Sequence, residues 1–247
     1  MGKNKLARWT ELDSFPNVIQ PSIDDIVEPC EQEENTDIRF PSGNVRVKDH
    51  SIKGRWNAEI FRNNNPVVLE LGCGRGEYTT GLATKFPGKN FIGVDIKGAR
   101  MWRGAKTSNE LKMGNAAFLR TRIEFINSFF AGDEVDEIWI TFPDPHPGAR
   151  NAGKRLTSPW YLNSYRQILK DKGIIHLKTD NKELFTYTAK VVETNSFEIL
   201  ASTTDLYSGD VRDDILSIKT HYEQIFLRSG LKINYISFRL DKNKQVI

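Results

Sequence analysis

The stretch VVLELGCGRGEYT, residues 67–79, runs from an apolar, strand-like segment into a turn that contains three glycines. Gly72, Gly74 and Gly76 let the backbone turn tightly and come close to a ligand. The dinucleotide-binding fingerprint Gly-x-Gly-x-x-Gly needs its third glycine at the position that Glu77 occupies here. The turn therefore predicts a cofactor at the end of a strand and argues against a nicotinamide dehydrogenase.

Two carboxylates near this turn indicate which cofactor it holds. Glu70 lies inside the first strand, where an acid without a partner is unfavourable, and an ammonium group on a ligand would supply that partner. Asp95 ends the next apolar run, 19 residues after Gly76, where an acid can accept hydrogen bonds from ribose hydroxyls. The pair, together with Gly72 and Gly74, fits S-adenosylmethionine better than NAD. A glycine turn with a solvated aspartate is the structural alternative.

Short apolar runs alternate with helical segments over most of the chain. Strands are predicted at residues 67–72, 90–96, 116–123, 137–142, 173–180, 197–206 and 231–240, and helices at 98–112, 158–171 and near 213–230. Strands that alternate with helices form a mostly parallel sheet covered on both faces. The sequence therefore predicts an α/β fold with a seven-stranded sheet.

Length and composition indicate a single large α/β domain. The chain has 247 residues, of which 38% are hydrophobic and 27% charged, and its formal net charge is +3. This mild positive charge permits a polyanionic partner without requiring one. The first 55 residues show no clear hydrophobic period, so we expect an N-terminal extension at 1–55, partly irregular, and a cofactor-binding α/β domain at 56–247.

No segment has the pattern of a signal peptide or a membrane span, and we expect a cytoplasmic protein without a membrane partner. Cys30 and Cys73 suit a reducing compartment. Neither the cysteines nor the four histidines show the spacing of a metal site, so no metal is predicted. The oligomeric state is left open as monomer or homodimer.

The run Phe142-Pro143-Asp144-Pro145 ends the fourth strand with a single acid. Proline fixes its own φ and biases the residue before it away from helix, so Phe142 and Asp144 are not expected to be helical. Asp144 is then held at the carboxyl end of a parallel strand, where open α/β sheets bind ligands. A turn acid that caps backbone amides is the alternative.

Basic residues form two groups. The group that follows the acid is expected to contact phosphates and comprises Arg150, Lys154, Arg155 and Arg166. A second set recurs at every third position of a predicted helix and is interpreted as a solvated face, comprising Lys97, Arg100, Arg103 and Lys106.

Between residues 66 and 240 the sequence resembles the bacterial tRNA (guanine-N7-)-methyltransferases. The resemblance rests on LELGCGRG, GVDI, FPDP followed by KRLT, HLKTDN and IKTHYEQIF, of which the glycine loop is common and the combination of the other motifs is specific. It implies a Rossmann-like methyltransferase fold whose last strand is antiparallel, so the domain expected at 56–247 would be an S-adenosylmethionine-dependent methyltransferase domain. It also implies methyl transfer from S-adenosylmethionine to N7 of a guanine in the variable loop of tRNA.

The resemblance also implies roles for individual residues. Those expected at the cofactor are Glu70, Asp95, Thr121 and Arg122; Asp144 is expected at the reacting centre; those expected at the guanine are Asp180, Thr220, Tyr222 and Glu223. Two departures stand out. Arg122-Ile123 replaces the Asp-Ala of many members, and the lysine that follows Pro-Asp-Pro in the family is missing, so Arg150 or Lys154 is expected to replace it.

These residue types suit the chemistry. Guanine N7 has a free lone pair, so no strong base is needed, and a carboxylate at Asp144 would stabilise the positive charge that develops on the purine. Guanine offers adjacent N1–H and N2 donors, which carboxylates at Asp180 and Glu223 can accept. Alone, Asp180 could be a helix N-cap and Glu223 a solvated helix acid.

Three other functions stay open at this stage. The same fold could methylate a small molecule or a protein, and the basic residues would then be unnecessary. A nicotinamide dehydrogenase is disfavoured by Glu77. A catalytically inactive RNA-binding module is disfavoured because Glu70, Asp95 and Asp144 are all intact.

Overall fold

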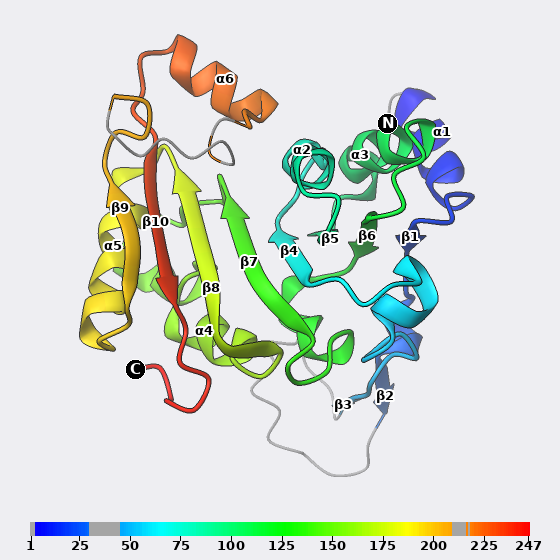
Figure 1. Ribbon diagram of the computed structural model, residues 1–247, viewed down its shortest axis with the longest axis horizontal. Helices are drawn as coiled ribbons and strands as arrows, with labels where there is room; N and C mark the ends of the chain where they lie inside the picture. The colour runs from blue at the N-terminus through cyan, green and yellow to red at the C-terminus, as the bar shows by residue number, and fades with distance from the viewer. Residues whose placement is uncertain (1–2, 30–44, 209–215, 217) are drawn as a thin grey trace.

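The computed structural model describes residues 3–29, 45–208, 216 and 218–247 (Figure 1). Its main sheet has the strand order β1-β6-β5-β4-β7-β8-β10-β9, and β2 and β3 form a separate pair. The strands are β1 (Val18–Ile19), β2 (Val27–Pro29), β3 (Val45–Val47), β4 (Val67–Leu71), β5 (Asn90–Asp95), β6 (Ala116–Arg120), β7 (Val135–Thr141), β8 (Leu169–Thr179), β9 (Ile199–Thr203) and β10 (Asn234–Arg239).

The helices connect these strands and lie on both faces of the sheet (Figure 1). The α-helices are α1 (Lys3–Leu12), α2 (Glu77–Lys85), α3 (Gly98–Glu110), α4 (Pro159–Tyr165), α5 (Lys182–Thr194) and α6 (His221–Arg228). Shorter helical turns are η1 (Ile23–Asp25), η2 (Trp56–Phe61), η3 (Ile123–Ser128) and η4 (Ala149–Lys154). Of the helix predicted near 213–230, residues 213–215 and 217 lie outside the described residues, as does Cys30.

The mostly parallel sheet is confirmed. Strands β4 to β8 and β1 pair in parallel, whereas β10 runs antiparallel to both β8 and β9. The expected number of strands was wrong, because the described residues give eight: β1 pairs with the edge of β6 through Val18 and Phe118. A strand of two residues is too short to produce a hydrophobic period.

The helix predicted at 158–171 was too long. It ends at Tyr165, and β8 already begins at Leu169, which pairs with Val135 of β7. Local helical preference is outweighed there by pairing along the neighbouring strand, a long-range contact that sequence periodicity does not contain.

The core lies on both sides of β4, which is buried over its whole length. Val67, Leu69 and Leu71 pack into the larger core cluster with α4 and α5, whereas Val68 packs into a second cluster with α2. Side chains alternate between the two faces of a strand, so Glu70 points to the same side as Val68 and toward α2. The Glu70 carboxylate therefore lies on the face of the sheet that α2 covers.

The glycine turn and α3 approach each other directly. A Cβ atom at Gly76 would lie 2.6 Å from the Phe118 ring and 3.1 Å from Cα of Gly104, and one at Gly104 would lie 2.8 Å from Cα of Gly76. The two glycines therefore bring α3 against the turn, which positions the start of this helix beside the strand ends.

The described part of residues 1–55 packs onto this domain. Helix α1 lies along α3, where Glu11 accepts hydrogen bonds from Trp102 Nε1 at 2.7 Å and from Lys106 Nζ at 2.8 Å. The Arg120 guanidinium lies 3.9 Å from the Trp9 ring centroid. Lys106, expected on a solvated face, is thus paired with α1. The domain boundary near residue 55 stays a prediction.

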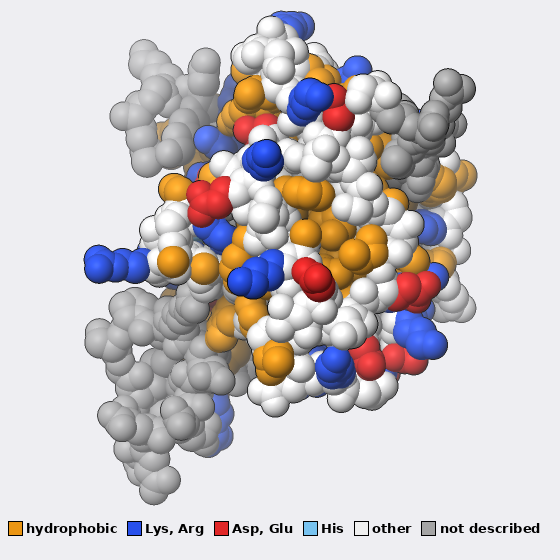
Figure 2. All heavy atoms as spheres, turned by 90° about the vertical axis from the view of Figure 1, so that its left-hand side faces the viewer, with side chains coloured by type: hydrophobic (Ala, Val, Ile, Leu, Met, Phe, Trp, Pro, Cys, Tyr) orange, Lys and Arg blue, Asp and Glu red, His pale blue; other side chains and the backbone are white. Residues whose placement is uncertain are grey.

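The far edge of the sheet is β9, where Ile199 is 48% exposed and Leu200 40% exposed. Figure 2 views the molecule from this side and shows apolar side chains interspersed with charged ones. Within the described residues, no helix has both the length and the apolar character needed to cross a membrane.

Candidate functional site

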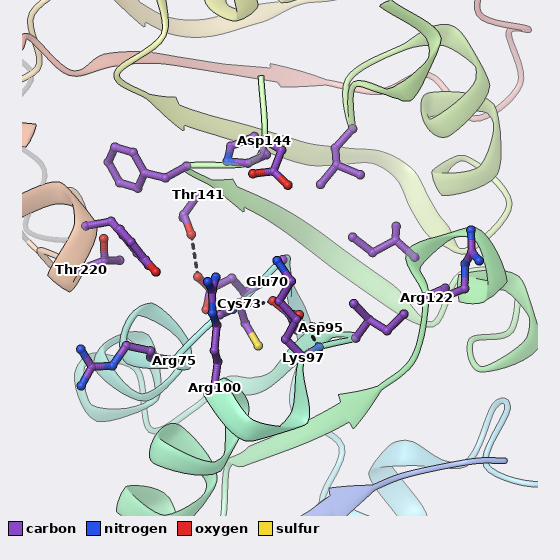
Figure 3. Close-up of a pocket in the computed structure, with 18 of the residues that line it drawn as sticks. Glu70, Cys73, Arg75, Asp95, Lys97, Arg100, Arg122, Thr141, Asp144 and Thr220 are labelled. Carbon is purple, nitrogen blue, oxygen red and sulfur yellow. Dashed lines mark hydrogen bonds between the residues drawn. The ribbon is translucent and has the colours of Figure 1, made fainter. Parts of the chain in front are cut away.

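A cavity of about 370 Å³ opens at the carboxyl ends of β4, β5, β6 and β7 (Figure 3). The residues singled out from the sequence that line it are Glu70, Gly72, Gly74, Asp95, Thr121, Arg122, Asp144, Lys154, Thr220 and Tyr222. Arg150, Asp180 and Glu223 are not in its wall. The volume is in the range of small-molecule sites in proteins.

Glu70 is buried at the base of the cavity, with 3% of its surface exposed. One carboxylate oxygen accepts from the Thr141 hydroxyl at 2.6 Å, and the other from the Thr79 amide at 2.8 Å and the Thr79 hydroxyl at 2.5 Å. The sequence suggested a ligand ammonium as the partner of Glu70; the fold itself already supplies Thr79 and Thr141. Burial nevertheless raises the pKa of Glu70 to about 7.

The glycine turn is fixed by Asp95. Gly72 and Gly74 adopt φ angles of 75° and 54°, the left-handed region that glycine enters without strain. Asp95 accepts from the amide of Gly74 at 2.9 Å and from the amide of Lys97 at 2.7 Å, so it joins the turn to the start of α3. A carboxylate has about four acceptor positions, so further donors can be bound.

Thr121 and Arg122 follow β6 and close another side of the cavity (Figure 3). Thr121 is buried, whereas Arg122 is exposed and pairs with Glu124 at 3.1 Å. Arg122, its partner Glu124 and the neighbouring Ile123 all line the cavity.

Asp144 projects from the loop after β7 toward the space that Glu70 and Asp95 also face (Figure 3). Its carboxylate is exposed, and within the described residues it accepts no hydrogen bond, so it is not the turn cap that was the alternative. Phe142 lies outside the right-handed helical region, as the proline after it indicated, and its φ is positive: Phe142 has φ 48° and His146 has φ 44°. Such left-handed residues store strain and gather at functional loops.

Arg155 holds this loop in place. Its guanidinium donates to the carbonyl of Pro145 at 3.2 Å and to that of His146 at 3.1 Å, and it pairs with Glu183 at 2.5 Å. Arg155 is 3% exposed, so the expectation of a phosphate contact was wrong for this residue. Arg166 donates instead to the carbonyl of Lys242 at 3.0 Å.

Other basic side chains remain at the rim. Lys154 lines the cavity and donates to Asn151 at 3.1 Å, and Arg150 is exposed on η4 nearby. Lys97 and Arg100, at the start of α3, also line the cavity (Figure 3). Part of the helix stripe that the sequence suggested was a solvated face therefore borders the site.

Helix α6 contributes Thr220 and Tyr222 to the wall, whereas Glu223 points into the protein and is 0% exposed. Glu223 pairs with the buried Lys178 at 2.8 Å. It is therefore not the solvated helix acid that was the alternative. The structure does not bring its carboxylate to the cavity.

Asp180 follows directly after β8 and lies outside the cavity wall, and burial raises its pKa. The N-cap of α5 is the next residue, Asn181, whose side chain accepts from the Leu184 amide at 2.8 Å. The capping alternative for Asp180 was therefore wrong by one position.

Sequence reasoning missed Thr79, Thr141 and Lys178 as residues that support the site, and it assigned Arg155 to phosphate contact instead of support of the loop. Thr141 offered a signal, since it is the polar residue that closes an apolar strand immediately before the Pro-Asp-Pro. The described residues contain no group of three or more side chains that could hold a metal ion.

Comparison with known proteins agrees with this geometry. Residues 64–235 match the model of a protein family described as "Putative methyltransferase". A tRNA (guanine-N(7)-)-methyltransferase of Bacteroides thetaiotaomicron is 50% identical over 240 residues, which cover 97% of this chain and 87% of the relative. The enzyme of the same name from Porphyromonas gingivalis is 56% identical over 190 residues, 76% of this chain and 77% of the relative.

The chain belongs to the tRNA (guanine-N(7)-)-methyltransferase family. Among solved structures, the 16S rRNA methyltransferase KamB superposes with a TM-score of 0.57 at 15% identity and covers 79% of this chain and 96% of its own. At that identity the likeness concerns the fold alone.

Proposed function

We propose that this protein transfers a methyl group from S-adenosylmethionine to N7 of a guanine in the variable loop of tRNA. The observation that carries the proposal is that Glu70, the glycine turn, Asp95 and Asp144 all open onto one cavity. Relatives at 50% and 56% identity bear the name of this activity. A tRNA substrate would place the protein in the cytoplasm.

The cavity suits the proposed cofactor. Burial raises the pKa of Glu70, so its carboxylate would gain a favourable partner in the ammonium group of the ligand. The acceptor positions that remain on Asp95 can bind ribose hydroxyls. Gly72 lets the backbone pass close to the ligand, and the Thr121-Arg122 turn would border its adenine through backbone groups. The cofactor supplies a methyl group already activated for transfer.

Asp144 is the proposed catalytic residue. Guanine N7 attacks with its own lone pair, so the protein has no proton to remove there. The purine becomes positively charged as the bond forms, and an exposed carboxylate fixed on the loop stabilises that charge more than it stabilises neutral guanine. The buried Arg155 keeps the loop from moving away, which preserves this electrostatic contact.

The substrate side is proposed to lie between the rim and α6. Lys154, with Arg150 beside it, is placed to contact RNA phosphates, and Asp180 could accept from guanine N1–H and N2 in its ionised form. Thr220 and Tyr222 would bound the base on the α6 side. A base taken from folded RNA must first be unstacked, at a cost of a few kcal/mol.

The direct test is methylation of unmodified total tRNA with labelled S-adenosylmethionine, followed by mapping of strand cleavage specific to 7-methylguanine. Label at a single variable-loop guanine is the expected result. Methyl transfer to cell extract that survives treatment with RNase would favour a small-molecule or protein substrate instead.

A further inference from the structure

Lys178 and Glu223 form an ion pair in the interior. Lys178 Nζ lies 2.8 Å from Oε1 and 3.1 Å from Oε2 of Glu223, and both side chains are 0% exposed. Burial lowers the pKa of Lys178, and the Glu223 carboxylate opposes that shift. An ion pair so far from water persists only when its geometry and its other hydrogen bonds are good.

The remaining polar atoms of the pair are satisfied. Lys178 Nζ also donates to the carbonyls of Leu216 at 3.2 Å and Ile218 at 3.3 Å, which together with Glu223 uses its three protons. Glu223 additionally accepts from the Tyr207 hydroxyl at 2.5 Å. Three separate parts of the chain, β8, the residues after β9 and the start of α6, therefore meet at these two charges.

Glu223 also closes the first turn of α6. Its amide donates to Thr220 Oγ1 at 3.2 Å, and its carboxylate accepts from the Thr220 amide at 3.4 Å, which is a capping box. The adjoining amide of His221 donates to Glu77 of α2 at 2.7 Å. The start of α6 is thus attached both to the sheet and to the helix after the glycine turn.

This attachment determines one wall of the cavity. Thr220 at the N-cap of α6 and Tyr222 in its first turn both line the cavity (Thr220 is labelled in Figure 3). For Glu223 to contact a bound base, its carboxylate would have to leave Lys178 as a buried cation without a partner. Breaking a buried pair in that way is strongly unfavourable.

We propose that Lys178 and Glu223 are a positioning pair, which holds the first turn of α6 so that Thr220 and Tyr222 shape the substrate side of the cavity, and that Glu223 does not itself read the guanine. The inference deepens the proposed function and rests on it only for the nature of the substrate. The pair itself is open to a test that needs no substrate.

The test compares Lys178→Met, Glu223→Gln and the double variant by hydrogen exchange of the α6 first-turn amides and by tRNA methylation. Each single change leaves one buried charge unpaired and should lower amide protection on the order of 100-fold, with kcat/KM for tRNA falling in parallel. The double variant removes both charges, and glutamine retains the capping box, so protection should return to within about tenfold of wild type. Arg228→Met, which removes an exposed cation at the other end of α6, is the control and should leave protection of the first-turn amides unchanged.

The two roles of Glu223 give opposite patterns. If Glu223 reads the base directly, Glu223→Gln keeps wild-type protection, and the double variant methylates tRNA no better than Glu223→Gln. Either result overturns the proposal. If the single variants do not fold, as thermal melting would show, the double variant decides alone: a folded protein with protected α6 amides supports the pair, and unprotected amides refute it. Failure of the wild type to methylate tRNA would refute the proposed function while leaving the exchange result interpretable.

Discussion

Glu70→Gln should make the protein more stable at neutral pH. A buried carboxylate whose pKa is raised from 4.5 to about 7 binds more protons in the folded state than in the unfolded state between those two values. Its ionisation therefore costs folding free energy that begins near pH 4.5 and is complete above pH 7. The shift is about 2.5 units, and at 1.36 kcal/mol per unit it comes to about 3 kcal/mol.

Glutamine preserves the local contacts. Its carbonyl can accept from the amide and hydroxyl of Thr79, and the Thr141 hydroxyl can rotate to accept from the new NH₂ group. The substitution therefore removes the ionisation without leaving a buried polar atom unpaired. The same change removes the negative charge proposed to hold the cofactor ammonium, so stability and cofactor affinity should move in opposite directions.

The assay is urea unfolding of both proteins at pH 5, 6, 7 and 8. The stability of Glu70→Gln minus that of wild type should grow with pH, by roughly 2.5 kcal/mol between pH 5 and pH 8, while the contributions of other titrating groups cancel in the difference. Calorimetry at pH 7.5 should show weaker binding of S-adenosylmethionine to the variant. Parallel stability curves would refute the reasoning, because they would mean that Glu70 titrates alike in the folded and unfolded states.

Three further predictions concern the cavity and its rim. Asp95→Ala should weaken S-adenosylmethionine binding roughly tenfold or more, through loss of charge-assisted hydrogen bonds; equal affinities by calorimetry would remove Asp95 from the cofactor site. Asp144→Asn should fold and bind tRNA normally but lose on the order of 10²–10³ in single-turnover methylation at saturating cofactor, and a near wild-type rate would reduce the Pro-Asp-Pro to a turn. Log affinity for tRNA falls as log salt rises, and Arg150→Ala and Lys154→Ala should each make this fall less steep by about one phosphate contact or less. An unchanged slope in the double variant would mean that this segment does not contact the RNA backbone.

Sequence reasoning worked where the signal is local. Alternation of apolar runs with helical segments was enough for a mostly parallel sheet, and the glycine turn after β4 marked the end of the sheet where the cavity lies. It failed where a neighbouring strand outweighs local preference, as at Leu169, and where an element is very short, as at Val18. Phe142 shows a third limit, because the proline after it indicates only that the residue avoids helix, whereas the positive φ of Phe142 is seen in the structure alone.

The sequence by itself determined which chemical groups stand at the strand ends, because strand ends and turns are encoded within a few residues of one another. Only the tertiary structure decided which charged side chains face the cavity and which are paired with one another inside the protein. Glu223 and Lys178 are 45 residues apart, and Arg155 and Glu183 are 28 residues apart, yet each pair meets in the folded chain. Such contacts depend on how strands and helices pack together. A charge that is buried without a partner strongly destabilises the folded protein, so the two members of each pair must be brought together by the fold. An arginine or a glutamate that reads as a surface group along the sequence can therefore become an internal support of the site.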